Sequence, residues 1–302
     1  MRIARGPIFA LVAALLFGVS PPLAKVLVGE TAPQLLAGLL YLGSGVGLTV
    51  ILLGRNFFDH PSKARERISG REWLWLVGAI IFGGIVAPVL LMVGLVRTEA
   101  ASASLLLNLE GVFTALIAWF AFREGVNRRV ALGFALILLG GIAISWTTGS
   151  GLHLSPAALL IVGACACWGL DNNFTRKVSH ADPFTTAALK GIVAGIVNVV
   201  LAHWIGADFP RGGSTLAALA LGFVSYGLSL VFFIVGLRHV GAARTGAYFS
   251  TAPFIGALVA AIFLHERLAL IVWIAGALMA AGVWLHLTES REDTANALKA
   301  AR

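Results

Sequence analysis

Long uninterrupted runs of apolar residues dominate this chain, and short segments between them carry most of its charge. The following seven runs contain no Asp, Glu, Lys or Arg: Gly6 to Ala24, Thr31 to Gly54, Trp73 to Val96, Val130 to Leu152, Gly212 to Leu237, Thr245 to Leu264 and Leu268 to Leu285. About 20 apolar residues suffice to cross the hydrocarbon core of a bilayer as a helix. The pattern therefore predicts seven membrane-spanning helices.

Three further apolar runs hold one ionisable residue each in their interior. These are Glu99 to Phe122 with Glu110, Leu154 to Ser179 with Asp171, and Pro183 to Trp204 with Lys190. Adding them predicts ten transmembrane helices in an all-α integral membrane protein.

The composition agrees with this prediction. Of the 302 residues, 59% are apolar and 12% are charged, and the mean hydropathy is +0.91. Soluble domains average roughly 45–50% apolar and 25% charged residues, so a water-soluble globule is excluded. Cys165 and Cys167 are predicted to pack inside a helix, because no second cysteine pair and no histidine at metal-ligand spacing accompanies them. Neither a metal nor a cofactor is expected.

The net charge of +8 reflects the loops and does not indicate a nucleic-acid-binding surface. Lys and Arg of short loops accumulate on the cytoplasmic side of membrane proteins. With the amino terminus inside the cell, the inner side collects seventeen of these residues, and the outer side has four, namely Lys25, Arg97, Arg211 and Arg267. We therefore expect both termini to be cytoplasmic in a bacterial inner membrane, with membrane lipids around the chain.

The chain repeats itself at an offset of 142 residues. At this offset the two halves align in the following pairs: Val93-Gly94-Leu95 with Val235-Gly236-Leu237, Ala100-Ala101 with Ala242-Ala243, and Glu124 with Glu266. Five helices in each half mean that the first half begins inside and the second begins outside. Residues 1–150 and 151–288 are thus predicted to be two inverted five-helix repeats, followed by a cytoplasmic tail at 289–302. Inverted repeats have two nearly equivalent arrangements, each open to one side, as alternating access requires.

The second half closes on residues that resemble the EamA domain of the drug/metabolite transporter superfamily. They are Thr251-Ala-Pro-Phe-Ile-Gly-Ala-Leu-Val-Ala-Ala-Ile-Phe-Leu-His-Glu266-Arg-Leu and Gly276-Ala-Leu-Met-Ala-Ala-Gly282. The first half repeats this signature more loosely from Asn108 to Glu124, with Gly111 where the second half has Pro253. The resemblance implies a central cavity lined by the first, third, fourth, sixth, eighth and ninth helices. It also implies export or exchange of small metabolites such as amino acids.

Ionisable groups inside a membrane cost about 2.5–3.5 kcal/mol on insertion scales, so each is a candidate for function. Glu110 has polar neighbours in sequence, whereas its counterpart in the second half is Ala252. A scaffold residue would be expected in both halves, so this asymmetry favours a cavity role, either binding a substrate cation or carrying a proton. The alternative is a glutamic acid that only hydrogen-bonds to a neighbouring helix.

Asp171 and Lys190 flank the same predicted cytoplasmic loop and should lie at similar depth. An ion pair would hold both charges in the membrane, and a gating or substrate-binding role is the alternative. The remaining candidates for substrate binding are the amides Asn108, Asn172 and Asn173 and the aromatic residues Trp168, Tyr226, Tyr248 and Phe17. For each of these, helix packing is the alternative to a substrate contact.

Prolines interrupt three predicted helices, at Pro21-Pro22, Pro88 and Pro253. Proline removes a backbone donor and clashes with the preceding turn, so each position predicts either a hinge or a static kink. Glu124 and Glu266, at equivalent helix ends, are predicted to make a structural cap or an interfacial contact.

The sequence thus predicts a secondary transporter that exports or exchanges a small-molecule substrate, with import of a related metabolite as the alternative. An intramembrane enzyme and a channel are alternatives of other classes. His265-Glu266 begins like a zinc-protease motif, but residue 269 is alanine where the second histidine should stand. A ring of like charges that would form a channel filter is not visible either. Small-residue faces on the fifth and tenth helices are compatible with a homodimer and equally with internal packing.

Overall fold

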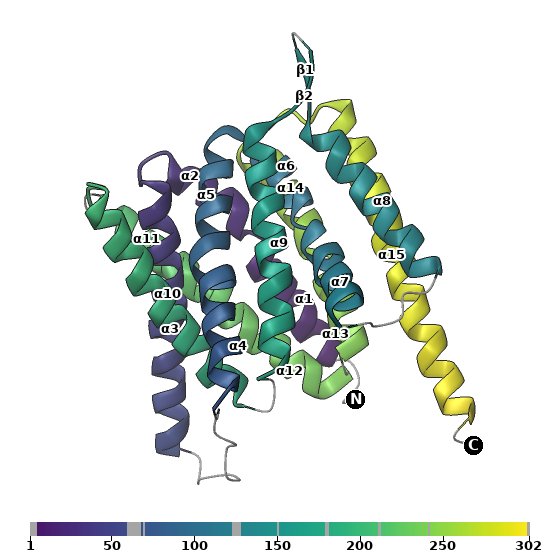
Figure 1. The fold of residues 1–302 in the computed structure, drawn as a ribbon, viewed down its shortest axis with the longest axis horizontal. Helices are drawn as coiled ribbons and strands as arrows, with labels where there is room; N and C mark the ends of the chain where they lie inside the picture. The colour runs from purple at the N-terminus through teal and green to yellow at the C-terminus, as the bar shows by residue number, and fades with distance from the viewer. Residues whose placement is uncertain are drawn as a thin grey trace.

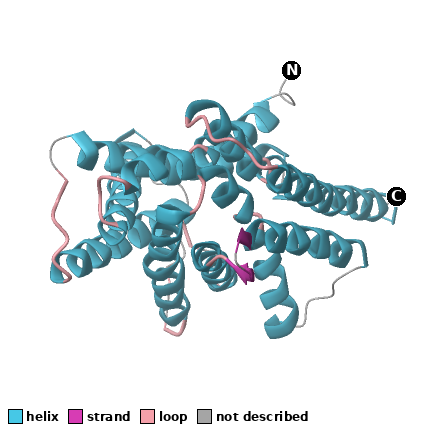
Figure 2. Cartoon of the chain, turned by 90° about the horizontal axis from the view of Figure 1, so that it is seen from above, coloured by secondary structure: helices cyan, strands magenta, loops and turns pink. Residues whose placement is uncertain are grey.

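The computed structural model describes residues 5–58, 68, 70–122, 128–149, 151–178, 181–210, 213–240 and 242–300. Over these residues the chain is a bundle of helices with one short β-hairpin (Figures 1 and 2). In chain order the elements are α1 (Arg5–Gly18), α2 (Ser20–Val28), α3 (Pro33–Phe58), α4 (Glu72–Ala79), the π-helix η1 (Ile80–Val86), α5 (Ala87–Arg97), α6 (Ala100–Leu106), α7 (Leu109–Phe122), α8 (Arg128–Ser145), β1 (Trp146–Gly149), β2 (Gly151–Leu154), α9 (Pro156–Arg176), α10 (Pro183–Trp204), α11 (Gly213–Gly222), the π-helix η2 (Phe223–Leu228), α12 (Ser229–Val240), α13 (Ala242–Phe249), α14 (Ala252–Phe263) and α15 (Leu270–Ala300).

Among the described residues, eight helical stretches, from Gly6–Val28 to Gly213–Gly236, are long and apolar enough to cross a membrane. They correspond to the first eight predicted helices. The ninth and tenth correspond to shorter apolar helices, Ala252–Phe263 and Leu270–Leu285. Helices satisfy their backbone N–H and C=O groups internally, which is why apolar segments adopt them in lipid. The chain is a multi-pass, helical membrane protein.

Three of the predicted helices break beside proline, as expected. Pro21 and Pro22 stand in the first turn of α2, Pro88 in the first turn of α5 and Pro253 in the first turn of α14. The first turn of a helix tolerates proline because its N–H groups have no partner inside the helix.

Two other breaks occur without proline. Leu107 and Asn108 separate α6 from α7, and the π-helix η2 separates α11 from α12. Each has a counterpart 143 residues away, since η1 begins at Ile80 and η2 at Phe223, while Leu107 matches the Ser250 that separates α13 from α14. Only one member of each pair carries proline, so the deformation follows the repeat and does not depend on proline alone.

Glycines bring two pairs of helices into close contact. A Cβ on Gly45 of α3 or Gly191 of α10 would overlap the backbone of the other helix. On α8 and α15, a Cβ on Gly140 would come within 2.8 Å of Met279, and one on Gly282 within 2.5 Å of the Gly133 carbonyl oxygen. Small residues let helix backbones approach closely in membranes. The small-residue faces of α8 and α15 therefore meet within one chain.

A β-hairpin replaces the end of one predicted helix. The apolar run Val130 to Leu152 is expected to be a single span, but α8 ends at Ser145 and β1 pairs antiparallel with β2. Threonine and glycine, which fill positions 147–149, have low helix propensity. At the other end of the chain, α15 continues as a helix to Ala300, through most of the predicted tail.

We call the end of the bundle that carries β1 and β2 the hairpin end. Figure 1 shows the start of α1 and the end of α15 at the opposite end. Figure 2, seen from above, shows the hairpin against the surrounding helices.

Candidate functional site

Glu110, in the first turn of α7, faces α9. Its carboxylate accepts a hydrogen bond from the side-chain amide of Asn172 at 2.9 Å, and the same amide donates to the Thr114 hydroxyl at 3.1 Å. The Thr114 hydroxyl in turn donates to the Glu110 backbone carbonyl at 2.8 Å. Glu110 is half-buried and Asn172 is exposed. The hydrogen-bond donor to this carboxylate is thus a neutral, exposed amide.

Lys190 of α10 and Asp171 of α9 form the predicted ion pair. Thr175, one turn along α9, donates to Asp171 Oδ1 at 2.9 Å and accepts from Lys190 Nζ at 3.3 Å. Both charged side chains are mostly buried, with exposed fractions of 15% for Lys190 and 11% for Asp171. Pairing and hydrogen bonding compensate the loss of hydration of buried charges. The contact favours the structural alternative for these two residues.

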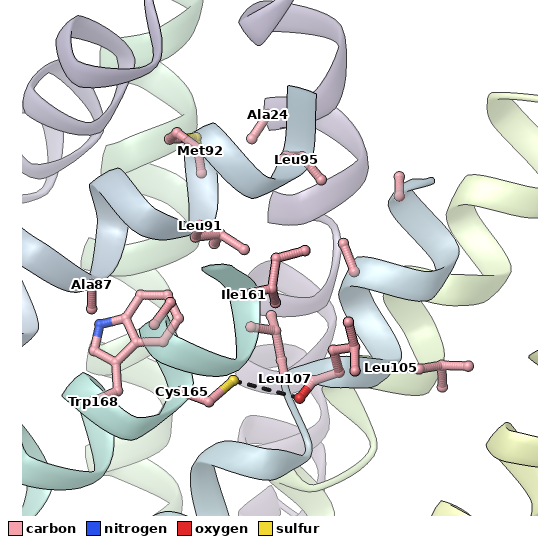
Figure 3. Close-up of a cluster of buried hydrophobic side chains, with 14 of the residues drawn as sticks. Ala24, Ala87, Leu91, Met92, Leu95, Leu105, Leu107, Ile161, Cys165 and Trp168 are labelled. Atoms are coloured by element: carbon pink, nitrogen blue, oxygen red, sulfur yellow. Dashed lines mark hydrogen bonds between the residues drawn. The ribbon is translucent and has the colours of Figure 1, made fainter. Parts of the chain in front are cut away.

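Trp168 and Tyr41 hold a backbone carbonyl of η1. Pro88 has no N–H, so it donates neither to Gly84, four residues before it, nor to Gly83, five residues before it. The Gly83 carbonyl instead accepts from the Tyr41 hydroxyl at 2.6 Å and from the Trp168 indole N–H at 3.0 Å. The indole N–H of Trp168 is therefore bound to the scaffold, and its ring lies in the buried apolar cluster (Figure 3).

The neighbouring carbonyl, that of Gly84, accepts from Asn198 of α10 at 3.0 Å. Asn198 is fully buried, and its side-chain oxygen accepts from Gln34 of α3 at 2.8 Å. Sequence reasoning missed both Tyr41 and Asn198. Two features of the sequence together could have found them. Pro88 lacks an N–H and so leaves backbone carbonyls without a donor, and Tyr41 and Asn198 are polar side chains in apolar helices that can supply one.

Tyr226, in the middle of η2, lies beside this group. Its hydroxyl accepts from Ser20 at 3.0 Å. Its ring lies 5.8 Å from the ring of Tyr41, and it meets the ring of Phe17 edge-on at 5.8 Å between centroids. Tyr226 therefore links η2 to α1, α2 and α3.

Asn173 bonds to backbone carbonyls and not to the Glu110 carboxylate. Its amide donates to the backbone carbonyls of Thr114 at 2.9 Å and Gly169 at 2.8 Å. The side chain is buried and fastens α9 to α7. Asn173 therefore has the scaffold role that sequence analysis kept as the alternative.

Asn108 and Tyr248 also lie apart from the Glu110 carboxylate's hydrogen bonds. Asn108 donates to the carbonyl of Leu105 at 2.9 Å and approaches the sulfur of Met279 at 3.8 Å. It thus satisfies the backbone at the break between α6 and α7. Tyr248 is half-buried on α13, where its backbone carbonyl accepts from the Thr251 hydroxyl at 2.6 Å.

The cysteines pack as predicted. Cys165 is fully buried, and its thiol donates to the Leu106 carbonyl at 3.5 Å (Figure 3). Cys167 packs against the same cluster. Across the part of the chain that the structure describes, no three His, Cys, Asp or Glu side chains are grouped to hold a metal ion.

Glu266 makes the predicted cap. Its two carboxylate oxygens accept from the backbone N–H groups of Ala100 at 2.7 Å and Ala101 at 2.9 Å, at the start of α6. Its counterpart Glu124 lies outside the described residues.

The chain is similar to known transporters and to a solved structure. A relative from Methanothermobacter thermautotrophicus, named an uncharacterized transporter, is 27% identical over 297 residues, covering 94% of this chain and 87% of its own. A relative from Salmonella typhimurium, named a probable amino-acid metabolite efflux pump, is 24% identical over 92% of this chain and 93% of its own. A solved crystal structure superimposes with a TM-score of 0.67 at 19% identity, covering 95% of this chain and 98% of its own, which shows the shared fold.

The model of the EamA-like transporter family matches residues 4–146 and again residues 155–288. The two matches cover most of the chain, in agreement with the resemblance seen in its sequence. The chain belongs to the EamA-like transporter family.

Proposed function

We propose that this protein is a secondary transporter that exports or exchanges a small metabolite, such as an amino acid, by alternating access. Ten membrane-spanning helices form two inverted repeats, at residues 1–150 and 151–288, followed by the tail at 289–302. The two family matches support this division, and so do the paired helix breaks that recur 143 residues apart. The printed name of the Salmonella relative supports an amino-acid-like substrate.

The environment of Glu110 carries the proposal. Of the three ionisable residues inside apolar runs, Lys190 is paired with Asp171. Glu110 keeps a neutral hydrogen-bond partner, Asn172, which is exposed near the end of α9. A carboxylate is costly in lipid, so one retained in this setting is suited to a cationic group. Glu110 therefore binds either the ammonium group of the substrate or a coupling proton.

The hairpin end faces the outside of the cell in this proposal. The excess of Lys and Arg belongs to the loops at the opposite end, where α1 begins and α15 ends (Figure 1). The protein then lies in a bacterial inner membrane with both termini in the cytoplasm.

Counterflow in liposomes tests the function. Purified protein is reconstituted with unlabelled amino acids, amines or nucleosides inside, and entry of the labelled compound is measured for the wild type and Glu110→Gln. Glu99→Gln is the matched control, because it removes an exposed carboxylate at the start of the same predicted helix, whose interior holds Glu110.

Saturable exchange of one compound class, lost in Glu110→Gln and kept in Glu99→Gln, is the expected result. Flux that rises linearly with concentration would instead indicate a channel. Exchange that survives Glu110→Gln would show that a residue other than Glu110 binds the substrate. Light scattering on the same purified protein decides between a monomer and a homodimer.

A further inference from the structure

Glu266 joins segments that are far apart in the chain. It lies in the link between α14 and α15, and its carboxylate accepts one hydrogen bond on each oxygen from Ala100 and Ala101, at 2.7 and 2.9 Å. The first N–H groups of a helix lack partners inside the helix, so a carboxylate there makes charge-assisted bonds. The second half of the chain is thereby fastened to the link between α5 and α6.

Lys25 adds a third segment at the same place. Its ammonium group, in the last turn of α2, donates to the carbonyls of Leu95 at 2.6 Å and Val96 at 3.1 Å, at the end of α5. Lys25 and Glu266 therefore fasten α2 and the α14–α15 link to the two sides of the α5–α6 link at the hairpin end.

The segments joined by Glu266 also pack closely against each other inside the bundle. A Cβ on Gly256 of α14 would come within 2.6 Å of both the Ser104 hydroxyl of α6 and the Gly18 carbonyl of α1. Tight packing of α14 on α6 therefore accompanies the contact between Glu266 and the start of α6.

Closure of the hairpin end also leaves unfavourable features in place. The hydroxyls of Thr31, in the link between α2 and α3, and of Thr98, in the link between α5 and α6, are buried without a hydrogen-bond partner among the described residues. Buried hydroxyls without partners are destabilising, and water would satisfy them if this end opened. His265, next to Glu266, has a φ of 54°, which is an unfavourable backbone conformation for a residue other than glycine. The closed arrangement therefore depends on contacts that offset these costs.

We propose that Glu266, together with Lys25, is the latch that keeps the hairpin end closed, and that its release opens the transporter to that side. The inference rests on the proposed function, because it assigns the latch to one of the two states of alternating access. Glu266 is bound to two backbone N–H groups while the latch is closed and is free when it opens.

Cysteine labelling tests the latch in the full-length chain. Cys165→Ala and Cys167→Ala remove the native thiols, and Thr98→Cys introduces a reporter thiol at a buried position. The native Thr98 hydroxyl has no hydrogen-bond partner among the described residues, so the change removes no hydrogen bond. A membrane-impermeant maleimide is added from the hairpin side, and the labelling rate is measured. Losing one charge-assisted hydrogen bond shifts a two-state population by about tenfold. Glu266→Gln is therefore expected to raise the labelling rate by about that factor.

Two further variants decide the outcome. Lys25→Met breaks the other half of the latch and should also raise the rate, which keeps the test valid if Glu266→Gln folds poorly. Asp208→Asn changes an exposed carboxylate in the link between α10 and α11, away from Lys25 and Glu266, and should leave the rate unchanged. The latch is overturned if both latch variants label at the parent's rate, or if Asp208→Asn raises the rate equally. Counterflow measured on the same vesicles separates the two proposals. A parent that exchanges nothing overturns the transporter, whereas an exchanging parent with unchanged labelling in the variants overturns only the latch.

Discussion

The carboxylate of Asp171 on α9 lies against the α-carbon of Gly83 in η1, so closely that a Cβ at position 83 would overlap it. The carbonyl of the same glycine is held by Tyr41 and Trp168. The ion pair between Asp171 and Lys190 is therefore built against a deformed helix whose freed backbone is itself hydrogen-bonded. This explains why a glycine stands at the deformation, and it favours a structural role for the pair.

Replacing Gly83 with alanine should displace Asp171. Overpacking of a filled interior costs about 1–3 kcal/mol, so Gly83→Ala is expected to lower the midpoint of thermal unfolding in detergent. Gly111→Ala is the matched control, because it adds the same methyl group where nothing lies within 4 Å. Equal unfolding midpoints for the two variants would contradict the close contact.

The ion pair predicts a non-additive double substitution. Lys190→Met leaves a buried carboxylate without its cation, which should destabilise the fold by about 3–5 kcal/mol. Adding Asp171→Asn removes that charge and should recover most of the loss. The wild type, the two single variants and the double variant are compared by thermal unfolding. A double variant no more stable than Lys190→Met would show that the unpaired Asp171 carboxylate does not cause the destabilisation.

The carbonyl freed by Pro88 predicts a rescue. Tyr41→Phe combined with Trp168→Phe removes both donors to the Gly83 carbonyl, and leaving a buried acceptor unsatisfied costs about 1–3 kcal/mol. Pro88→Ala restores a backbone N–H near that carbonyl, so it should reduce the loss in the Phe/Phe protein. The free energy of unfolding is measured for the Phe/Phe protein with and without Pro88→Ala. An equal loss of stability in both would contradict the idea that Tyr41 and Trp168 replace the N–H that Pro88 lacks.

Neighbouring asparagines should respond in opposite ways. Asn172→Ala removes the donor to Glu110 from an exposed position, so it should leave stability within about 0.5 kcal/mol of the wild type. Without the amide that orients its carboxylate, Glu110 should bind a cationic group less well, so the substrate concentration for half-maximal counterflow should rise by about tenfold, which corresponds to about 1.4 kcal/mol.

Asn173→Ala removes two buried hydrogen bonds to backbone carbonyls and should instead lower the unfolding midpoint. The properly folded fraction of this variant should still exchange substrate with an unchanged half-maximal concentration. The reverse pattern, with Asn173 controlling exchange and Asn172 controlling stability, would contradict the assignment of the two residues.

The positions of the helix breaks illustrate how far local patterns reach. Pro21, Pro88 and Pro253 were enough to predict three breaks, because the loss of a backbone donor is a property of the residue itself. The breaks at Leu107 and at η2 have no such residue. They become visible only through their counterparts in the other half, because contacts between helices stabilise them. The hairpin after Ser145 was hidden in the same way by the apolar character of its surroundings.

The sequence predicted the charged residues of the candidate site but not most of the residues that hydrogen-bond around them. Glu110, Asp171 and Lys190 stand out because a charge in an apolar helix is rare whatever surrounds it. Tyr41 and Asn198 are as important to the arrangement, but their role exists only because α3 and α10 pack against η1. Asn108, Asn172 and Asn173 look alike in sequence, yet they bond to a helix break, to Glu110 and to a neighbouring backbone respectively.

Apolar run length was sufficient to determine a helical multi-pass membrane protein, and the residues from Thr251 to Gly282 were sufficient to show a resemblance to the EamA family, to which the chain belongs. Both are properties of the local sequence, because run length reports how a segment meets lipid and a family signature is read residue by residue. Tertiary structure alone decided that Asp171 is neutralised by Lys190 while Glu110 has an amide partner, and that Glu266 reaches α6 across 166 positions of sequence. Those pairings depend on which helix faces pack together, because a short-range hydrogen bond forms only between groups that the whole fold brings within about 3 Å.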